Sequence, residues 1–531
     1  MPHTCNLQVL PHEAASNSLL QHIIADEMGI TSEEITGFFI TRQSVDARSR
    51  QPRIQLTVQV FVATPAEPRQ HVQFQWKNVQ QAPHEVHIIG AGPAGLFAAL
   101  QLLEQGIRPI ILERGKDVRS RRRDLALLNK EGVLNTESNY CFGEGGAGTY
   151  SDGKLYTRSN KRGNVTRILE LFYHFGADEK ILYQSHPHIG TNKLPHIITA
   201  IRAHIIQCGG KVHFETKVTD FHIENGRISE LVLDCGSRIA VSAVVLATGH
   251  SARDIFELLH KKNIQIEAKP FALGVRVEHP QALIDEAQYH CTIRNPYLPP
   301  ASYSLVQQVQ GKGVFSFCMC PGGIIAPATT MPNQLVVNGW SPSKRNNPFA
   351  NSGMVVSVEA QDAFAFLKAQ RQKPTIDDPL LLLRFQQLVE EAAYTAGGGR
   401  FRAPAQRMGD FFEKKISTSL PDCSYIPGLT TSALEAVLPG FIHEKLRLAF
   451  RAFGKKMKGY FSNEAVVVAT ESRTSSPVRI PRMAEKLCHP QISNLYPCAE
   501  GAGYAGGIVS AAMDGEKVAA AITAVLMPNR H

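Results

Sequence analysis

The sequence predicts an α/β protein in which a domain with a parallel sheet is preceded by a small N-terminal unit and interrupted by an inserted domain. The segment EVHIIGAGPAGLFAALQLLEQGIRPIILER, which begins at Glu85, has the pattern strand, glycine-rich turn, helix, strand. Both strands are continuous apolar runs of the kind buried in parallel sheets. The C-terminal segment NLYPCAEGAGYAGGIVSAAMDGEKVAAAITAVL returns to a strand, a glycine-rich turn and a long helix. The intervening stretch mixes further strands and helices.

Composition places the chain among globular proteins. At about 150 residues per domain, its 531 residues correspond to three or four domains, and 43% hydrophobic residues argue against disorder. Ten cysteines without paired spacing do not fit a disulfide-rich secreted domain, so a reducing compartment is expected. The sequence starts without a basic stretch leading into an apolar run, and its longest apolar runs fall short of the ~20 residues of a spanning helix. We therefore expect a cytoplasmic protein without a membrane span.

Four segments are expected along the chain. Residues 1–82 form an accessory α/β unit, with a helix over ASNSLLQHIIADEMG and strands over NLQVL, GFFITRQSV and RIQLTVQVFV; docking or dimerisation is its default interpretation. A linker ends near Pro83. Residues 84–265 form the first part of the parallel-sheet domain and residues 461–531 its C-terminal part. Residues 266–460 form an inserted β-rich α+β domain that we expect to bind the substrate.

The turn GAGPAG predicts a dinucleotide site. It follows an apolar strand and opens a helix, so that Gly90 permits the tight turn, Gly92 lets a pyrophosphate approach the backbone and Gly95 lets the helix pack on the sheet. Exposed N–H groups and the helix dipole then favour phosphate. Glu113 ends the second strand, 18 residues after Gly95, where an acid binds ribose hydroxyls in such domains. This context makes the Rossmann-type fingerprint strong.

Two distant segments indicate FAD rather than a nicotinamide cofactor. VVLATGHSARD (244–254) and NLYPCAEGAGYAGG (494–507) each place a strand before a turn of small residues, which lets the backbone lie against a further part of an extended ligand. Glu113 also argues against NADP, because a carboxylate repels the additional phosphate. No second GxGxxG follows a strand, so no built-in NAD(P)H domain is expected.

These segments resemble the FAD domain of the glutathione-reductase-like flavoprotein superfamily, and most closely its poorly characterised branch of FAD-dependent dehydrogenases from bacteria and plastids. The motifs that carry the resemblance are FGEGGAGTYSDGKL (142–155), CMCPGG (318–323), ANSG (350–353), ESRTSSPVRI (471–480) and EGAGYAGGI (500–508). They extend from about residue 84 to the end of the sequence. In the superfamily the late acid binds the ribityl chain, and the resemblance gives this role to Glu500.

Two glycine clusters indicate further places where the backbone lies close to the cofactor. FGEGGAGTYSDGKL contains Gly145, Gly146 and Gly148, and the entropy that these glycines lose is offset if the flavin or the pyrophosphate lies against the backbone; a mobile surface loop is the alternative. Gly506 and Gly507 open the last long helix. We expect its N-terminal N–H groups to face the flavin N1–C2=O edge and to stabilise negative charge there on reduction.

The expected cofactor-binding residues are Gly90, Gly92, Pro93, Ala94, Gly95, Glu113, Arg114, Arg122, Gly145, Gly146, Gly148, Val218, Thr248, Gly249, Glu500, Gly506, Gly507 and Ile508. Arg122 belongs to a basic run that also contains Arg119, Arg121 and Arg123. One or two members of this run would bind FAD phosphates, because guanidinium groups match phosphate oxygens; a solvated helix face explains most of the run equally simply.

Four residues are candidates for catalysis. Cys318 and Cys320 form CMC, which is either a redox dithiol or, because alternate residues of a strand share one face, a pair of small core residues. Arg473 and Arg479 lie in ESRTSSPVRI, whose dense polar residues indicate either a pocket wall for an anionic or hydroxylated substrate or a polar turn. No metal site is expected, because no further cysteine pair stands at ligand spacing.

The expected function is an FAD-dependent oxidoreductase that transfers a hydride through flavin N5 to or from a small molecule. Its electrons would come from the substrate, from transiently bound NAD(P)H or from an electron-transfer protein. Two alternatives stay open. One is a tRNA-modifying flavoprotein, which the net charge of +9 encourages although no interleaved basic and aromatic patch is visible. The other is a flavin-binding protein without turnover.

Overall fold

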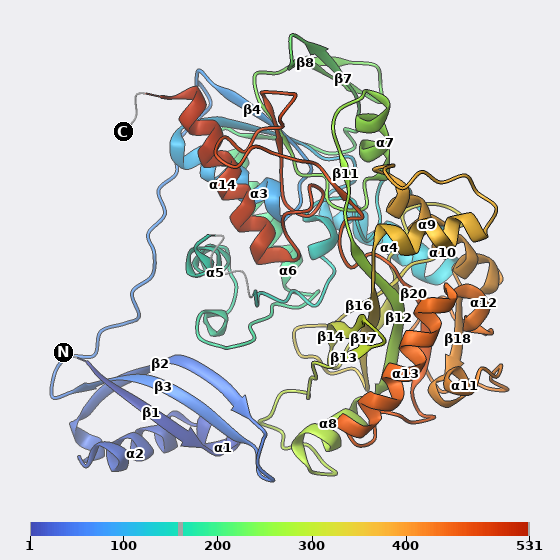
Figure 1. The fold of residues 1–531 in the computed structure, drawn as a ribbon. Helices are drawn as coiled ribbons and strands as arrows, with labels where there is room; N and C mark the ends of the chain where they lie inside the picture. The colour runs from blue at the N-terminus through green and yellow to red at the C-terminus, as the bar shows by residue number, and fades with distance from the viewer. Residues whose placement is uncertain (1, 158–162, 529–531) are drawn as a thin grey trace.

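The computed structural model describes residues 2–157 and 163–528 of the chain. Figure 1 shows a small N-terminal unit beside two larger layers of sheet and helix. The main sheets have three, five and seven strands, and the five-stranded sheet is parallel. The α/β fold with a parallel sheet is thereby confirmed.

The N-terminal unit is an antiparallel sheet of order β1-β3-β2 with a helix on one face (Figure 1). Alternate residues of β3, among them Ile54, Leu56 and Val58, are buried, as strand periodicity requires. The elements are β1 (His3–Val9), α1 (Pro11–Ala14), α2 (Asn17–Met28), β2 (Ile35–Asp46) and β3 (Arg53–Val62). It is also hydrogen-bonded to the rest of the chain: the Gln43 N–H donates to the Tyr183 carbonyl over 2.9 Å.

The five-stranded parallel sheet has the order β22-β10-β4-β5-β6, so the last strand of the chain forms one edge of the sheet, beside β10. One face is covered by α3 and α14, which pack on each other, and by α6 (Figure 1). The strands are β4 (Glu85–Ile89), β5 (Arg108–Leu112), β6 (Lys211–His213), β10 (Val244–Leu246) and β22 (Leu495–Pro497). The helices are α3 (Pro93–Gln105), α4 (Val118–Glu131), α5 (Val165–His174), α6 (Leu194–Gln207) and α14 (Ile508–Leu526).

The other face of the parallel sheet is covered by a small antiparallel sheet and by α7. Phe221 and Leu231 of the small sheet and Phe256 of α7 are buried in one apolar cluster with Ile110 and Val244. The elements are β7 (Val218–Glu224), β8 (Arg227–Leu233), β9 (Arg238–Ala240) and α7 (Arg253–Lys261). The carboxyl ends of the parallel strands are thus left open between a helical layer and a β layer.

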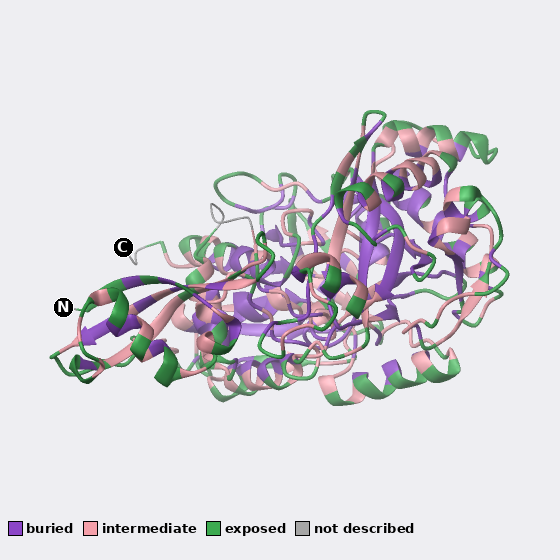
Figure 2. Ribbon diagram, turned by 90° about the horizontal axis from the view of Figure 1, so that it is seen from below, coloured by how far each residue is buried: buried purple, intermediate pink, exposed green. Residues whose placement is uncertain are grey.

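The inserted domain is built on the seven-stranded sheet of order β13-β14-β17-β12-β20-β18-β19. Figure 2 shows the central strands of this sheet and those of the parallel sheet as largely buried. The strands are β12 (Phe271–Pro280), β13 (Val306–Val309), β14 (Lys312–Cys320), β17 (Phe349–Val358), β18 (Ala403–Arg407), β19 (Leu429–Thr431) and β20 (Val466–Glu471). Its helices are α8 (Gln281–Tyr289), α9 (Ala360–Ala369), α10 (Leu381–Ala396), α11 (Met408–Glu413), α12 (Leu434–Val437) and α13 (Gly440–Lys456).

The inserted domain ends later than the sequence indicates. β20 pairs with β12 and β18, so the sheet extends to Glu471 rather than ending at residue 460. An apolar strand such as VVVATE fits either domain, and only its pairing decides between them. Two short sheets complete the chain: β15 (Ile324–Pro327) with β16 (Val337–Trp340), and β11 (Glu267–Ala268) with β21 (Val478–Arg479). Among the described residues, every helix is too short or too polar to cross a membrane.

Candidate active site

A cavity of about 380 Å³ lies where the two large domains meet. The parallel-sheet domain lines it with the β4–α3 turn, the end of β5, residues 146–154, residues 247–252 and the start of α14. The inserted domain contributes Phe317, Cys318, Asn338, Arg473 and Thr474. The cavity therefore has one wall from each domain.

The glycines of the β4–α3 turn have different roles. A Cβ on Gly90 would lie 2.4 Å from the Ala247 carbonyl oxygen, and a Cβ on Gly95 would lie 2.0 Å from the Gly90 carbonyl oxygen, so both are required for packing. A Cβ on Gly92 would meet nothing closer than 3.9 Å. Gly92 lines the cavity, so its bare backbone is open to a ligand, whereas Gly95 does not line the cavity.

Glu113 holds this turn together. Its carboxylate accepts hydrogen bonds from the N–H groups of Ala91, Gly115 and Gly143, at 2.8, 2.9 and 2.9 Å. The side chain is buried yet lines the cavity. Because each carboxylate oxygen can accept more than one bond, Glu113 can support the turn and still accept from a ligand hydroxyl.

Arg121, rather than Arg122, organises the second glycine cluster. Its guanidinium is fully buried and donates to five backbone carbonyls, those of Asn139, Tyr140, Gly143, Glu144 and Gly146. Arg122 is exposed and lies outside the cavity lining, so it is not placed to bind phosphate. The helical spacing of the sequence could have indicated that Arg121 is buried, because Arg121, Leu125 and Leu128 share the buried face of one helix.

The second glycine cluster folds against the β4–α3 turn. The Gly145 N–H donates to the Ala91 carbonyl over 2.8 Å, and Gly145 lies outside the cavity lining. Gly146 and Gly148 line the cavity, and Gly146 faces Gly92 so closely that a Cβ would lie 3.2 Å from the Gly92 Cα. This segment is therefore an ordered part of the site.

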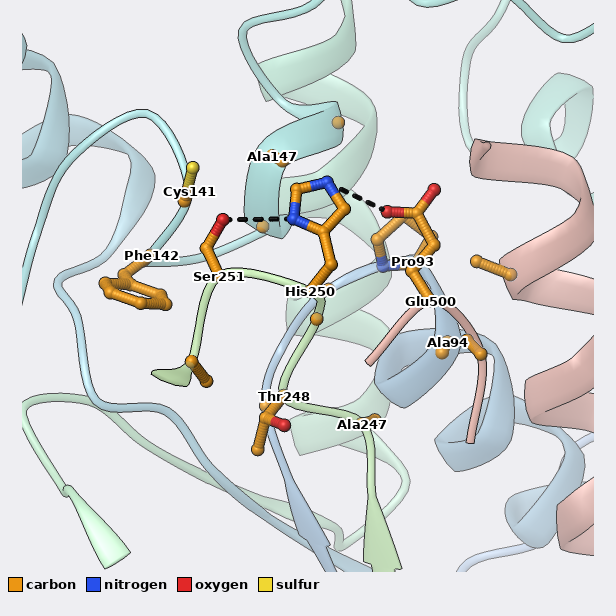
Figure 3. Close-up of a pocket in the computed structure, with 18 of the residues that line it drawn as sticks. Pro93, Ala94, Cys141, Phe142, Ala147, Ala247, Thr248, His250, Ser251 and Glu500 are labelled. Atoms are coloured by element: carbon orange, nitrogen blue, oxygen red, sulfur yellow. Dashed lines mark hydrogen bonds and ion pairs between the residues drawn. The ribbon is translucent and has the colours of Figure 1, made fainter. Parts of the chain in front are cut away.

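The turn after β10 supplies polar groups to the cavity. Figure 3 shows His250 between Ser251 and Glu500; its Nδ1 lies 3.0 Å from the Ser251 Oγ and its Nε2 lies 3.6 Å from a Glu500 oxygen. Burial, helped by Arg473 and Arg253, lowers the pKa of His250 to about 4, and burial raises the pKa of Glu500 to about 7. Burial thus opposes the charged form of both side chains, unlike in an ordinary ion pair.

The start of α14 faces the cavity with bare backbone. Gly506, Gly507 and Ile508 line it, and neither glycine would bring a Cβ within 4 Å of another atom. The helix is anchored by Asp514, whose carboxylate accepts from the Ala499 N–H and from Arg482. The N-terminal dipole of a long helix is thus fixed toward the ligand space.

The residues of the parallel-sheet wall fit FAD. Gly92, Gly249, Gly506 and Gly507 leave open space where side chains would lie, so they form a cradle for an extended ligand. The Thr248 Oγ1 is buried without a hydrogen-bond partner in this wall, which leaves a polar group for the cofactor. Arg114 also lines the cavity, held by Glu137 and Asp254.

The inserted wall carries a buried charge cluster. Glu390 on α10 lies 2.8 Å from a nitrogen of Arg253 and 3.2 Å from a nitrogen of Arg473. Arg473 also donates to the Thr330 Oγ1 over 2.8 Å and lines the cavity. Arg479, the other arginine of that motif, is exposed outside the cavity lining and stacks on Tyr504.

The two cysteines of CMC lie with their thiols next to each other, but only one of them reaches the cavity. β14 has a bulge between Phe317 and Cys320, where Cys318 takes a left-handed φ of 47°. Cys318 therefore lines the cavity, whereas Cys320 is fully buried behind it, outside the lining. The bulge overturns the alternation expected from a regular strand.

Most predicted residues come together in the structure. Those that line the cavity are Gly90, Gly92, Pro93, Ala94, Glu113, Arg114, Gly146, Gly148, Val218, Thr248, Gly249, Cys318, Arg473, Glu500, Gly506, Gly507 and Ile508. Those outside the lining are Gly95, Arg122, Gly145, Cys320 and Arg479. Sequence reasoning missed Lys154, Asp152 and His250, which also line the cavity.

Three family models match separate parts of the chain. Residues 83–233 match a family described as an FAD binding domain, and residues 270–474 match one described as an FAD-dependent protein, C-terminal domain-like. Residues 1–61 match a domain of unknown function. Together with the glycine cradle, the first two matches identify FAD as the cofactor and the chain as a flavoprotein.

Among solved structures, glycine oxidase from Bacillus cereus has 15% identity and a TM-score of 0.30, and the match covers 84% of this chain and 96% of that one. THI4 from Thermovibrio ammonificans has 20% identity and a TM-score of 0.25, and the match covers 35% of this chain and 64% of that one, slightly under two thirds of its length. These distant likenesses bear on neither substrate nor reaction.

A relative among curated proteins is far more similar. An uncharacterized protein of Clostridium beijerinckii is 38% identical over 520 residues, which is 94% of this chain and 95% of the relative. The match spans all three units of the structure, the N-terminal unit included. The chain belongs to the same protein family as this Clostridium beijerinckii protein.

Proposed function

We propose that this flavoprotein is an oxidoreductase whose substrate is a small molecule bound between the cofactor turns and the inserted domain. The observation that carries the proposal is the double lining of the cavity. One wall fits FAD, and the other places Phe317, Cys318, Asn338 and Arg473 opposite it. A wall from a second domain, with an apolar ring and several convergent polar groups, is what a substrate site next to a cofactor needs.

The chain's own residues would prepare this reaction in three ways. Glu113 and Arg121 hold the glycine turns in the form that leaves the cradle open. The start of α14 directs its dipole toward the ligand space, where it would stabilise an anion. The inserted wall excludes water from one side. When bound, FAD would supply hydride exchange at its N5 atom.

The charge of the inserted wall supports an anionic or hydroxylated substrate. Two guanidinium groups, those of Arg253 and Arg473, share the single carboxylate of Glu390, so the cluster retains a net positive charge. Arg473 is the member of this cluster that also lines the cavity, next to Thr474. A buried positive charge beside a cavity attracts a carboxylate or phosphate ligand.

The proposal is tested by photoreducing the holoprotein without oxygen and screening small anions for those that reoxidise the flavin. Arg473→Met should slow reoxidation by an acceptor found in this way at least ~100-fold, because a desolvated charge partner is lost, while the FAD absorbance stays. Arg479→Met is the matched control, since this arginine lies outside the cavity lining, and it should change the rate less than ~2-fold. Equal effects of the two substitutions, or no small acceptor at all, would contradict the proposal.

A further inference from the structure

Two sequence motifs to which the proposed function assigns no chemical step meet at one place on the cavity wall. SDGK contributes Lys154 and CMC contributes Cys318, and both residues line the cavity. The Lys154 Nζ lies 3.9 Å from the Cys318 Sγ and donates to the Met319 carbonyl. An ammonium group is thus held beside a thiol in the ligand space.

The bulge in β14 presents this thiol to the cavity. Phe317 pairs with Gly353 and Cys320 pairs with Asn351, so two residues of β14 face only one residue of β17. Cys318 takes up the extra length in a left-handed conformation that non-glycine residues rarely adopt. Strained backbone of this kind is concentrated at functional sites, where it aims a side chain.

The groups around Cys318 stabilise its thiolate. Its neighbours are the Cys320 thiol, the cations of Lys154 and Arg276, and the carboxyl groups of Asp152, Glu471 and Glu500. Near pH 6 the three acids are largely offset: Asp152 is bound by Arg345, Glu471 is bound by Arg276, and the pKa of Glu500 is raised by burial to about 7. The Cys320 thiol and then the two cations outweigh burial and hold the pKa of Cys318 well below its usual value.

We propose that Cys318 and Lys154 form a nucleophile and proton-donor pair for soft carbon electrophiles, with activated alkenes conjugated to a carbonyl as the chemical class. The Sγ would form a bond to the β-carbon, and the electrons of the C=C bond would move toward the carbonyl. The Lys154 Nζ would then give a proton to the α-carbon and regain one from water. A thiolate next to a cation is the form of cysteine that does this chemistry.

This inference rests on the proposed function in one respect, because it places the activated alkene at the substrate wall. Its test requires no turnover of FAD. The holoprotein is treated with N-ethylmaleimide, an activated alkene, and labelling of each cysteine is followed by peptide mass spectrometry. At about pH 6, Cys318 should react at least ~10-fold faster than free N-acetylcysteine. Its rate should change less than ~3-fold up to about pH 8, whereas that of the free thiol rises nearly ~100-fold.

Two lysine variants separate this role from general structure. Lys154→Met should slow labelling of Cys318 at about pH 6 at least ~10-fold, because the neighbouring cation is lost, and Lys154→Arg should restore much of the rate. Lys217→Met is the matched control: Lys217 also lines the cavity but binds Glu137 and Asp254, so it should leave the rate unchanged. Should Lys154→Met not fold, Cys320→Ala should still slow labelling at least ~3-fold, because it removes the thiol that faces Cys318.

The proposed pair of Cys318 and Lys154 would be overturned by a labelling rate that rises with pH as that of the free thiol does. Equal labelling rates in Lys154→Met and Lys217→Met would also overturn it. Flavin absorbance is recorded in every sample, so a failure of the proposed function, seen as missing FAD or no reoxidation, is distinguishable from a failure of the thiolate.

Discussion

The two walls of the cavity are built from different materials. The FAD wall consists largely of backbone turns in which glycines leave space, as at Gly92 and Gly507. The inserted wall consists of side chains whose charges are buried with partners, such as Arg473 with Glu390 at 3.2 Å. A wall of backbone recognises the shape of its ligand, whereas a wall of charged side chains can also set the charge of the substrate.

The largest effect on stability and FAD binding is expected for Arg121, the side chain that supports the backbone turns of the FAD wall. Arg121→Met should lower the free energy of unfolding by roughly 4 kcal/mol and abolish FAD retention, because five carbonyls lose their donor. Chemical denaturation and flavin absorbance measure the two effects. Arg122→Met, on the exposed side of the same helix, should change neither, and a loss of FAD from that variant would return phosphate binding to Arg122.

The second-largest effect measures how much the bare backbone at Gly92 contributes to FAD binding. Gly92→Leu should weaken FAD binding at least ~100-fold, about 2.7 kcal/mol, because the new side chain would grow into space that only the ligand uses. Titration of the apoprotein with FAD measures it, and the melting temperature of the apoprotein should stay unchanged. Gly440→Leu is the control, since Gly440 is exposed at the start of α13 and also has open space. Full FAD affinity in Gly92→Leu would contradict the cradle.

The smallest effect concerns the pH response of the inserted domain. Burial lowers the pKa of His279, on β12, to about 4, so the neutral ring is fully favoured above the unfolded value of about 6.5 and this stability is lost as the pH falls from there toward 4. Between about pH 6.5 and 4.5 the wild type should lose about 2 kcal/mol more than His279→Gln. Denaturation at both pH values measures the difference. Identical losses in the two proteins would show that His279 does not titrate as its burial requires.

The FAD wall could be predicted from sequence because its signals are local. A few adjacent residues are enough to identify the strand, turn and helix around Gly90, Gly92 and Gly95. The same holds for the start of the last helix. The inserted wall could not be predicted from sequence, because the contacts in it and behind it join distant positions. Arg276 and Glu471 are 195 residues apart, and Lys154 and Cys318 are 164 residues apart. The bulge that separates Cys318 from Cys320 has no signature in CMC itself. The domain boundary near 460 failed for the same reason, since β20 is assigned only by its pairing.

The bridge formed by Arg253, Glu390 and Arg473 limits how a ligand can enter. Arg253 begins α7 of the cofactor domain, whereas Glu390 belongs to α10 of the inserted domain, and both are fully buried or nearly so. A hinge motion that parted the domains would separate Glu390 from Arg253, at a cost of roughly 3–5 kcal/mol. The bridge therefore opposes such a motion. Tyr156 lines the cavity and is 51% exposed, so a larger or smaller side chain at this position should change the rate of ligand exchange more than the chemistry in the interior.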